Sequence, residues 1–155
     1  PKMVSNRFCP GCSKRGGVII MKQEIIDLAR YRMTKAEECF KDSELLLEQG
    51  SIPGAINRLY YTTFHAARAL LATKEMDASS HSGVITLFSK HIVKEGLLFP
   101  ETAKTLSRAL EKRLDSDYED YAEFNQKEVE KMREEVKNFI ESCSGILKRL
   151  LDEVR

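Results

Sequence analysis

Four side chains that could carry out chemistry follow one another at helical spacing in one stretch of the chain, residues 55–72. The four are Arg58, Tyr61, His65 and Arg68. At 100° per residue they fall on one face of a helix. Guanidinium groups can hold a phosphate, and an imidazole can exchange a proton near neutral pH. This face therefore predicts a site for an anionic ligand.

The same four side chains have a structural interpretation. They could pair with acidic residues of neighbouring helices, such as Asp115 and Asp117, or lie in a dimer interface. Arg58 and His65 are seven residues apart, so their backbones lie ~10 Å apart along a helix. Both interpretations therefore place the residues on one surface, and they differ in what covers it.

The opposite face of this helix is apolar, and it predicts how the site is held. Its members are Ile56, Leu59, Tyr60, Thr63, Phe64, Ala67, Leu70 and Leu71. An apolar stripe along one face is typical of a helix that packs against a hydrophobic core. The binding face therefore needs other helices behind it.

Helical periodicity of apolar residues continues along most of the chain. The expected helices are 22–49, 51–73, about 80–96, 100–114 and 125 to the carboxyl end. Gly50 suits a helix end, Ser51 and Asn125 suit helix starts, and residues 115–118 are expected to interrupt a helix because their helix propensity is low. With no strand-like alternation and no repeat, we predict an all-α fold, an up-and-down antiparallel bundle of about five helices.

Residues 1–20 differ from the rest, and we expect them to be an amino-terminal extension, disordered or flexible, before a helical domain at 21–155. The extension carries Cys9-Pro-Gly-Cys12, which is similar to one knuckle of a zinc ribbon. Zinc normally needs four ligands, so a second knuckle from a dimer partner would be required. Cys39 and Cys143 lie in apolar stripes and are expected to be small core residues. We expect no cofactor, with zinc at Cys9 and Cys12 as the alternative.

Composition limits the remaining choices. The chain has 155 residues, a formal net charge of +1, and 42% hydrophobic and 32% charged residues. These values are typical of a globular protein and exclude a disordered chain. Nucleic-acid binding would have to come from a local patch, because there is no large overall charge. No apolar run is long enough to cross a membrane, and we expect a cytoplasmic protein.

Three segments together resemble a known family. They are Arg58-Leu-Tyr-Tyr-Thr-Thr-Phe-His65 with the residues after it, His81-Ser-Gly-Val-Ile-Thr-Leu-Phe88, and Arg113-Leu-Asp-Ser-Asp-Tyr118. Their order and spacing resemble the HEPN domain, the higher-eukaryote and prokaryote nucleotide-binding domain, in its small stand-alone prokaryotic branch. The resemblance covers about residues 22–155. It implies a helical bundle, a homodimer, and pairing with a minimal nucleotidyltransferase in systems that resemble toxin–antitoxin pairs.

The resemblance also implies where chemistry would occur. Active members are metal-independent endoribonucleases with an arginine followed, after four to six residues, by a histidine. Arg113 matches the arginine, and Tyr118 stands where the histidine is expected. A tyrosine with an ordinary pKa near 10 is a poor general base at neutral pH. Asp115 and Asp117 also add negative charge that opposes a phosphodiester.

We therefore predict a non-catalytic or weakly catalytic module that binds nucleotide, RNA or a nucleotidyltransferase partner. The binding residues expected are Arg58, Tyr61, His65, Arg68, Arg113 and Tyr118. The alternative is a metal-independent endoribonuclease that uses Arg113 with His65 or another nearby histidine. His81 is expected at a helix start, where it would cap that helix or contact the helix before it.

Overall fold

The computed structural model describes residues 12–15, 18–118 and 125–154. Its elements are β1 (Cys12–Arg15), β2 (Val18–Met21), α1 (Gln23–Glu48), α2 (Ile52–Ala72), α3 (His81–Phe88), a π-helical turn η1 (Ser89–Val93), α4 (Pro100–Tyr118) and α5 (Gln126–Asp152). The four long helices and the short α3 confirm the predicted bundle of about five helices.

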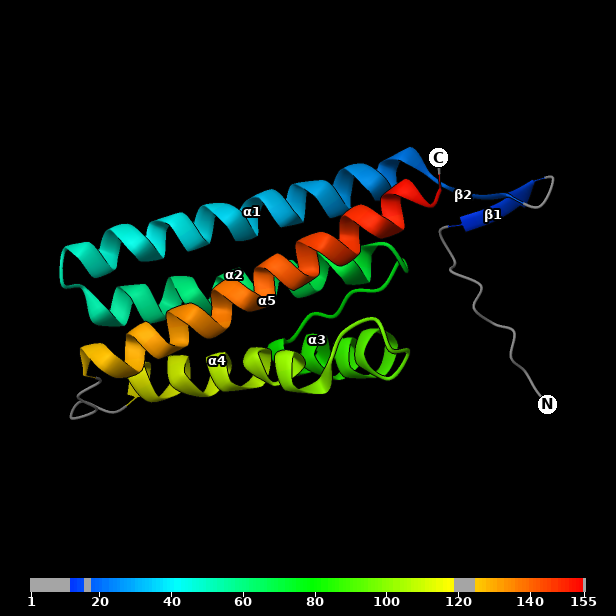
Figure 1. The fold of residues 1–155 in the computed structure, drawn as a ribbon. Helices are drawn as coiled ribbons and strands as arrows, with labels where there is room; N and C mark the ends of the chain where they lie inside the picture. The colour runs from blue at the N-terminus through cyan, green and yellow to red at the C-terminus, as the bar shows by residue number, and fades with distance from the viewer. Residues whose placement is uncertain (1–11, 16–17, 119–124, 155) are drawn as a thin grey trace.

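The long helices run alternately up and down, and α2 is the element that the others surround (Figure 1). Helix α2 contacts α1, α3, α4 and α5, and α5 also contacts α1 and α4. This central position follows from the sequence of α2, in which twelve of its 21 residues are buried. Because its polar face meets α1 on one side and α3 and α4 on the other, side chains from several helices converge there.

The connection between α1 and α2 behaves as the sequence predicts at Gly50. Gly50 has φ of +77°, a left-handed conformation that glycine adopts without steric cost. The N–H of Ser51 donates to the carbonyl of Leu46 at 2.9 Å, and that of Gly50 donates to Leu47 at 3.1 Å. These bonds satisfy carbonyls at the end of α1. Ser51 precedes α2 as expected, but its side chain makes no capping hydrogen bond.

The predicted core face of α2 is confirmed. Leu59, Tyr60 and Leu70 have no exposed surface, and Phe64 is half-buried. Helical spacing also puts Leu28 and Leu114 on the apolar stripes of the helices expected at 22–49 and 100–114, but each is 42% exposed. They lie at the edges of their stripes, where a small rotation of the helix turns a side chain outward.

Helix α4 does not stop where its composition suggests. The expected interruption at 115–118 is wrong, because α4 runs to Tyr118. The poor helix formers Asp115, Ser116 and Asp117 each cost only ~0.5 kcal/mol in a helix, which tertiary contacts readily override. Asp117 also lies 3.6 Å from Arg113 at i, i+4 spacing, a pair that supports the helix.

Two further features were not predicted. Within the extension and at its end, β1 and β2 pair as antiparallel strands, with Cys12 as the partner of Met21. Each strand has only four residues, which is too few for an alternation of apolar and polar side chains to be detected in the sequence. The helix expected to reach Gly96 ends as α3 at Phe88 and continues as the π-helical turn, with Gly96 at φ +79° after it.

Two features of the described residues bear on the class of protein. None of their helices has the length and apolar content that a membrane span requires. Cys39 and Cys143 are buried free thiols, which confirms their core position. Burial raises the pKa of both thiols, so they stay protonated at neutral pH.

Candidate functional site

Tyr61 is the centre of the polar face of α2, and it lies between two arginines. The guanidinium carbon of Arg58, one helical turn earlier, is 5.4 Å from the centroid of the Tyr61 ring. The guanidinium of Arg113 reaches the same ring from α4, at 5.1 Å. Both distances are within cation–π range. The structure therefore brings together Arg58, Tyr61 and Arg113, three of the residues predicted from the sequence.

Among the described residues, the Arg113 guanidinium contacts aromatic rings and forms no hydrogen bond. Its guanidinium also lies 5.3 Å from the ring of Tyr60. Its Nε is 3.6 Å from Asp117, an ion-pair distance that is too long for a hydrogen bond. That Nε is buried and has no hydrogen-bond partner among the described residues. Since an unsatisfied buried donor costs about 1–3 kcal/mol, this arginine calls for a functional explanation.

His81 reaches the site from the start of α3, and the local sequence explains its position. Ser80 caps α3 by accepting a hydrogen bond from the N–H of Gly83 at 3.0 Å. A Cβ at residue 83 would lie 2.9 Å from the Ser80 hydroxyl, so only glycine allows this cap without a shift. The first helical residue, His81, then points at α2, where its ring lies 4.8 Å from that of Phe64. The prediction that His81 contacts the preceding helix is confirmed.

The hydroxyl of Tyr60 is hydrogen-bonded to Nδ1 of His81. Burial raises the pKa of Tyr60, so its hydroxyl stays protonated. Burial and then the charge of Arg113 lower the pKa of His81, so its imidazole is neutral at pH 7. The bond therefore joins a neutral hydroxyl to a neutral imidazole, and its direction depends on the tautomer of His81. In the tautomer in which Tyr60 donates to Nδ1, the ring carries its proton on Nε2 and presents an N–H donor there.

His65 lies on the other end of the same face. Its ring centroid is 5.9 Å from that of Tyr61 and 5.7 Å from that of Phe64. Burial lowers its pKa, and so do four cations, namely Arg68, Lys35, Arg58 and Arg32. Arg113 is not among them, so the contacts that join His65 to Arg113 pass through Tyr61. The histidine whose pKa Arg113 affects is His81.

Arg68 has a different environment from Arg58 and Arg113. It binds the carboxylate of Asp77 with two hydrogen bonds, at 3.0 and 2.7 Å, and Arg32 of α1 binds the same carboxylate at 2.9 Å. Hydrogen bonding to Arg68 is the main reason that the pKa of Asp77 falls to about 2. An acidic partner was one interpretation of Arg68, but it comes from the α2–α3 loop and not from Asp115 or Asp117.

Arg58 is oriented by an amide and not by an acid. Its Nε and one terminal nitrogen donate to the side-chain oxygen of Asn57 at 3.3 and 2.9 Å, and the other nitrogen is 4.0 Å from Cys39. No described carboxylate forms an ion pair with it. Its positive charge is therefore available to a ligand.

The comparisons with known proteins agree with this arrangement. The sequence pattern of the HEPN domain matches residues 29–147. The chain belongs to the HEPN domain family. This match spans α1 to α5 and includes every residue of the site described above.

Several relatives resemble this HEPN chain along most of its length. A UPF0332 protein of Thermotoga maritima is 33% identical over 129 residues, 83% of this chain and 96% of its own length. Two proteins of Methanocaldococcus jannaschii carry provisional toxin names. One is 33% identical over 71% of this chain and 78% of its own length, and the other 30% identical over 85% and 98%.

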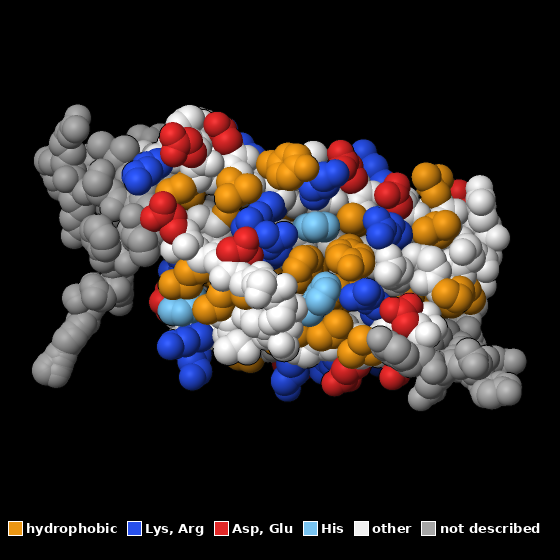
Figure 2. All heavy atoms as spheres, turned by 180° about the vertical axis from the view of Figure 1, so that it is seen from behind, with side chains coloured by type: hydrophobic (Ala, Val, Ile, Leu, Met, Phe, Trp, Pro, Cys, Tyr) orange, Lys and Arg blue, Asp and Glu red, His pale blue; other side chains and the backbone are white. Residues whose placement is uncertain are grey.

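The side chains of the site lie on one surface of the domain, together with histidines. Figure 2 shows the face turned away from the viewer in Figure 1, where histidine side chains lie among cationic and apolar ones. Cationic side chains beside aromatic rings on one face suit a ligand that has both phosphate groups and flat bases. The polar face of the HEPN domain is thus a candidate nucleotide or RNA interface.

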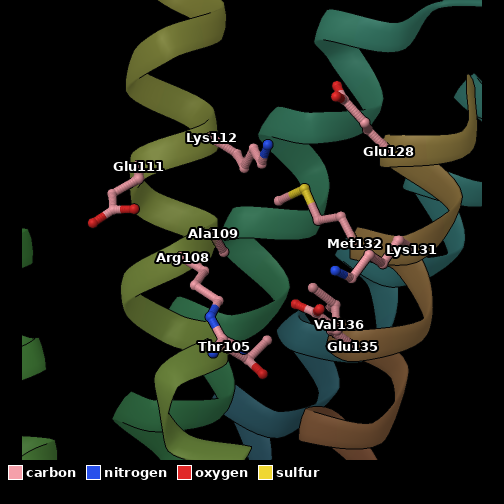
Figure 3. Close-up of a pocket in the computed structure, with 10 residues that line it drawn as sticks. All are labelled: Thr105, Arg108, Ala109, Glu111, Lys112, Glu128, Lys131, Met132, Glu135 and Val136. Carbon is pink, nitrogen blue, oxygen red and sulfur yellow. The ribbon is translucent and has the colours of Figure 1, made fainter. Parts of the chain in front are cut away.

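A separate groove of about 490 Å³ runs between α4 and α5 (Figure 3). Arg108 and Lys112 line it from α4, and Lys131 and Glu135 from α5. The carboxylate of Glu111 points away from it in Figure 3. Because acids and cations alternate along its rim, the groove offers no consistent charge to an anionic strand.

Helix α4 carries a basic stripe, Lys104, Arg108 and Lys112 at i, i+4 and i+8 spacing, which is partly neutralised within its own helix. Glu101 forms ion pairs with Lys104 at 2.8 Å and with Arg108 at 3.8 Å. Both pairs are exposed and weak, but they leave the stripe less positive than its sequence implies. Arg113, one residue beyond Lys112, is the cation of α4 that reaches the aromatic site.

Other candidate residues fall at the limits of the described structure. Tyr118 ends α4, but its side chain is not among the described ones, and Cys9 lies outside the described residues. The predicted roles of Tyr118 in binding and of Cys9 and Cys12 in zinc binding stay predictions. Among the described residues, no group of three or more histidine, cysteine or acidic side chains is arranged to hold a metal ion.

Proposed function

We propose that this HEPN domain is a binding module that holds a phosphate-bearing ligand, a nucleotide or RNA, against Arg113 and Arg58. The observation that carries the proposal is the state of Arg113. Its guanidinium rests on two tyrosine rings, and its buried Nε has no hydrogen-bond partner among the described residues. Although Nε is buried, the side chain as a whole is 21% exposed, so a phosphate can reach the other guanidinium nitrogens, and arginine binds phosphate strongly.

The neighbours of Arg113 support the same ligand. Arg58 adds a second cation on the shared Tyr61 ring, with an amide rather than a carboxylate as its partner. In the tautomer in which Tyr60 donates to Nδ1, His81 adds an Nε2–H donor. Arg68 is the contrasting case, since Asp77 already takes its hydrogen-bonding capacity. We therefore assign phosphate binding to Arg113, Arg58 and His81 and a structural role to Arg68.

We further propose that the module acts as a homodimer in a nucleotidyltransferase-paired system that resembles a toxin–antitoxin pair. Two observations support this step. Relatives from Methanocaldococcus jannaschii carry provisional toxin names. The family resemblance also implies pairing with a minimal nucleotidyltransferase.

Binding to two simple probes tests the proposal. Titrations with AMP and with a fluorescein-labelled twelve-nucleotide RNA, followed by calorimetry and fluorescence anisotropy, should give saturable binding to the wild type. Arg113→Ala should weaken both by at least tenfold with an unchanged Tm. Lys148→Ala, which alters an exposed lysine of α5, should bind as the wild type does. If the wild type binds neither probe, the proposal is wrong, and a protein partner becomes the first candidate.

One observation favours a second candidate function, metal-independent endoribonuclease activity. Arg113 affects the pKa of His81 and shares the Tyr60 contact with it, so a phosphate at Arg113 would meet an imidazole N–H. Only the imidazolium form of His81 could donate a proton to a leaving oxygen, so this function requires the negative charge of a bound phosphate to raise the pKa of His81, while Arg113 stabilises the developing charge. The alternative predicted from the sequence pairs Arg113 with His65. The ring of Tyr61 lies between these two side chains, because it contacts both of them.

Cleavage assays separate this candidate from binding alone. Labelled RNA is incubated with the protein in the presence of a chelator and without added metal. Cleavage that is lost in both Arg113→Ala and His81→Ala, and kept in His65→Ala, would support an endoribonuclease centred on His81. Retention of RNA without cleavage would support the binding module.

A further inference from the structure

The site at Arg113 continues across α2 onto α1 through a series of contacts. Arg113 stacks on Tyr61, and Tyr61 contacts the His65 ring. On α1, Lys35 lies one helical turn from Arg32, which donates to the carbonyl of Arg68 at 3.1 Å, and one turn from Cys39, whose sulfur is 4.0 Å from Arg58, so Lys35 is on the side of α1 that meets this part of α2. Lys35 in turn lies 5.8 Å from the ring of Tyr31. One line of side chains therefore crosses three helices, from α4 to the outer side of α1.

Tyr31 is the end of this line and differs from the other rings in it. It is 60% exposed, whereas Tyr61 and His65 are half-buried. An exposed ring with a cation beside it has no stabilising role in the core that would explain it. A flat, accessible ring of this kind is suited to stacking against a nucleobase, which contributes about 1–3 kcal/mol per base.

The charges along the line are mostly positive. Every charged group that shifts the pKa of His65 is a cation, and these groups come from both α1 and α2. Among the described residues, the acids that form ion pairs with the line are Asp77, bound by Arg32 and Arg68, Glu38, 3.8 Å from Lys35, and Asp117, 3.6 Å from Arg113. The line therefore keeps more cations than acids, and aromatic rings lie between them.

We propose that this line, from Arg113 over Tyr61 and His65 to Lys35 and Tyr31, binds a single RNA strand several nucleotides long. The inference rests on the proposed function and extends it, because it selects a polynucleotide over a mononucleotide and adds Tyr31 and Lys35 as binding residues. Arg113 and Arg58 hold the phosphate at one end. Lys35 contacts a phosphate further along the strand, and Tyr31 stacks on a base beyond it. A duplex would present no free base to Tyr31.

The length of the ligand gives the first test. Single-stranded RNA of twelve nucleotides should bind at least tenfold more tightly than AMP, and more tightly than a hairpin RNA with a paired stem of equal length. Equal affinity for AMP and the strand would overturn the extension onto α1 while leaving the proposed site at Arg113 intact. Failure of both ligands to bind would overturn both.

Variants at the α1 end give the second test. Tyr31→Ala should weaken binding of the twelve-nucleotide RNA by about 5- to 100-fold, as expected for one lost stack, and should leave AMP binding unchanged. Lys35→Ala should lower the dependence of log affinity on log salt concentration by about 0.7, the value for one phosphate of a single strand. Both side chains are exposed, so the fold should be kept, and Lys41→Ala on the same helix is the matched control. RNA binding by Tyr31→Ala that equals the wild type would contradict the proposal.

Discussion

The hydroxyl of Tyr60, in the middle of α2, is hydrogen-bonded to Nδ1 of His81, the first residue of α3. This bond determines which histidine approaches Arg113. It also orients the imidazole, because a ring that accepts a hydrogen bond at Nδ1 carries its proton on Nε2. In that tautomer the remaining N–H is the group that we propose as a donor to the ligand at Arg113.

Removal of the charge of Arg113 should change the two histidines differently. Arg113 lowers the pKa of His81 and is not among the charges that lower that of His65. Arg113→Ala should therefore raise the pKa of His81 and leave that of His65 unchanged. An NMR pH titration of the histidine resonances measures both. A shift at His65 with none at His81 would contradict the arrangement described for the site.

Stability should fall as the pH drops below about 6.5. Burial lowers the pKa of His65 and of His81 from 6.5, so the unfolded state takes up protons that the folded state resists. Since stability rises with pH wherever the unfolded state binds more protons, it is lost as the pH falls through this range. His65→Asn removes one such group. Urea unfolding at pH 5 and 7 should show a smaller loss for His65→Asn than for the wild type, and an equal loss would count against a buried His65.

Core truncation should separate two leucines that the sequence treats alike. Leu70 has no exposed surface, so Leu70→Ala should lower the free energy of unfolding by ~2–5 kcal/mol. Leu114 is 42% exposed, and Leu114→Ala should change it by no more than ~0.5 kcal/mol. Chemical denaturation measures both values. Similar losses for the two variants would show that one of them has been placed wrongly.

The two predicted helix caps should also differ. Asn125 accepts a hydrogen bond from the N–H of Glu128 at 2.9 Å, whereas the Ser51 side chain makes no capping bond. Asn125→Ala should cost ~1 kcal/mol of stability, and Ser51→Ala should cost clearly less. The comparison is made from urea midpoints. A larger effect at Ser51 would mean that its hydroxyl caps α2 in solution.

The sequence predicts the bundle well because its signals are long and periodic. The core face of α2, the glycine end of α1 and the Asn125 start of α5 all come from local patterns that tertiary contacts reinforce. The pairing of β1 with β2 and the continuation of α4 to Tyr118 were not predicted. The strands are too short to give a clear alternation, and in α4 contacts such as that of Asp117 with Arg113 outweigh a weak local helix preference.

The site was predicted only in part, because its partners come from distant elements. Helical spacing places Arg58, Tyr61 and His65 on one face, and the family resemblance singles out Arg113. Nothing in the spacing shows that Asp77, in a loop, would engage Arg68, or that Tyr60, a core residue, would orient His81. These pairings join residues 9 and 21 positions apart, and only the fold specifies them.

The most direct test of the phosphate site is the RNA affinity of Arg113→Lys against that of Arg108→Lys, measured by fluorescence anisotropy with the twelve-nucleotide RNA. Both changes keep the positive charge and lie on α4, but Arg108 is exposed and pairs only weakly with Glu101. Lysine lacks the planar fork that stacks on the tyrosines and binds a phosphate through two nitrogens. We predict that Arg113→Lys binds at least tenfold more weakly and that Arg108→Lys binds as the wild type does. Wild-type affinity in a folded Arg113→Lys would contradict the central claim.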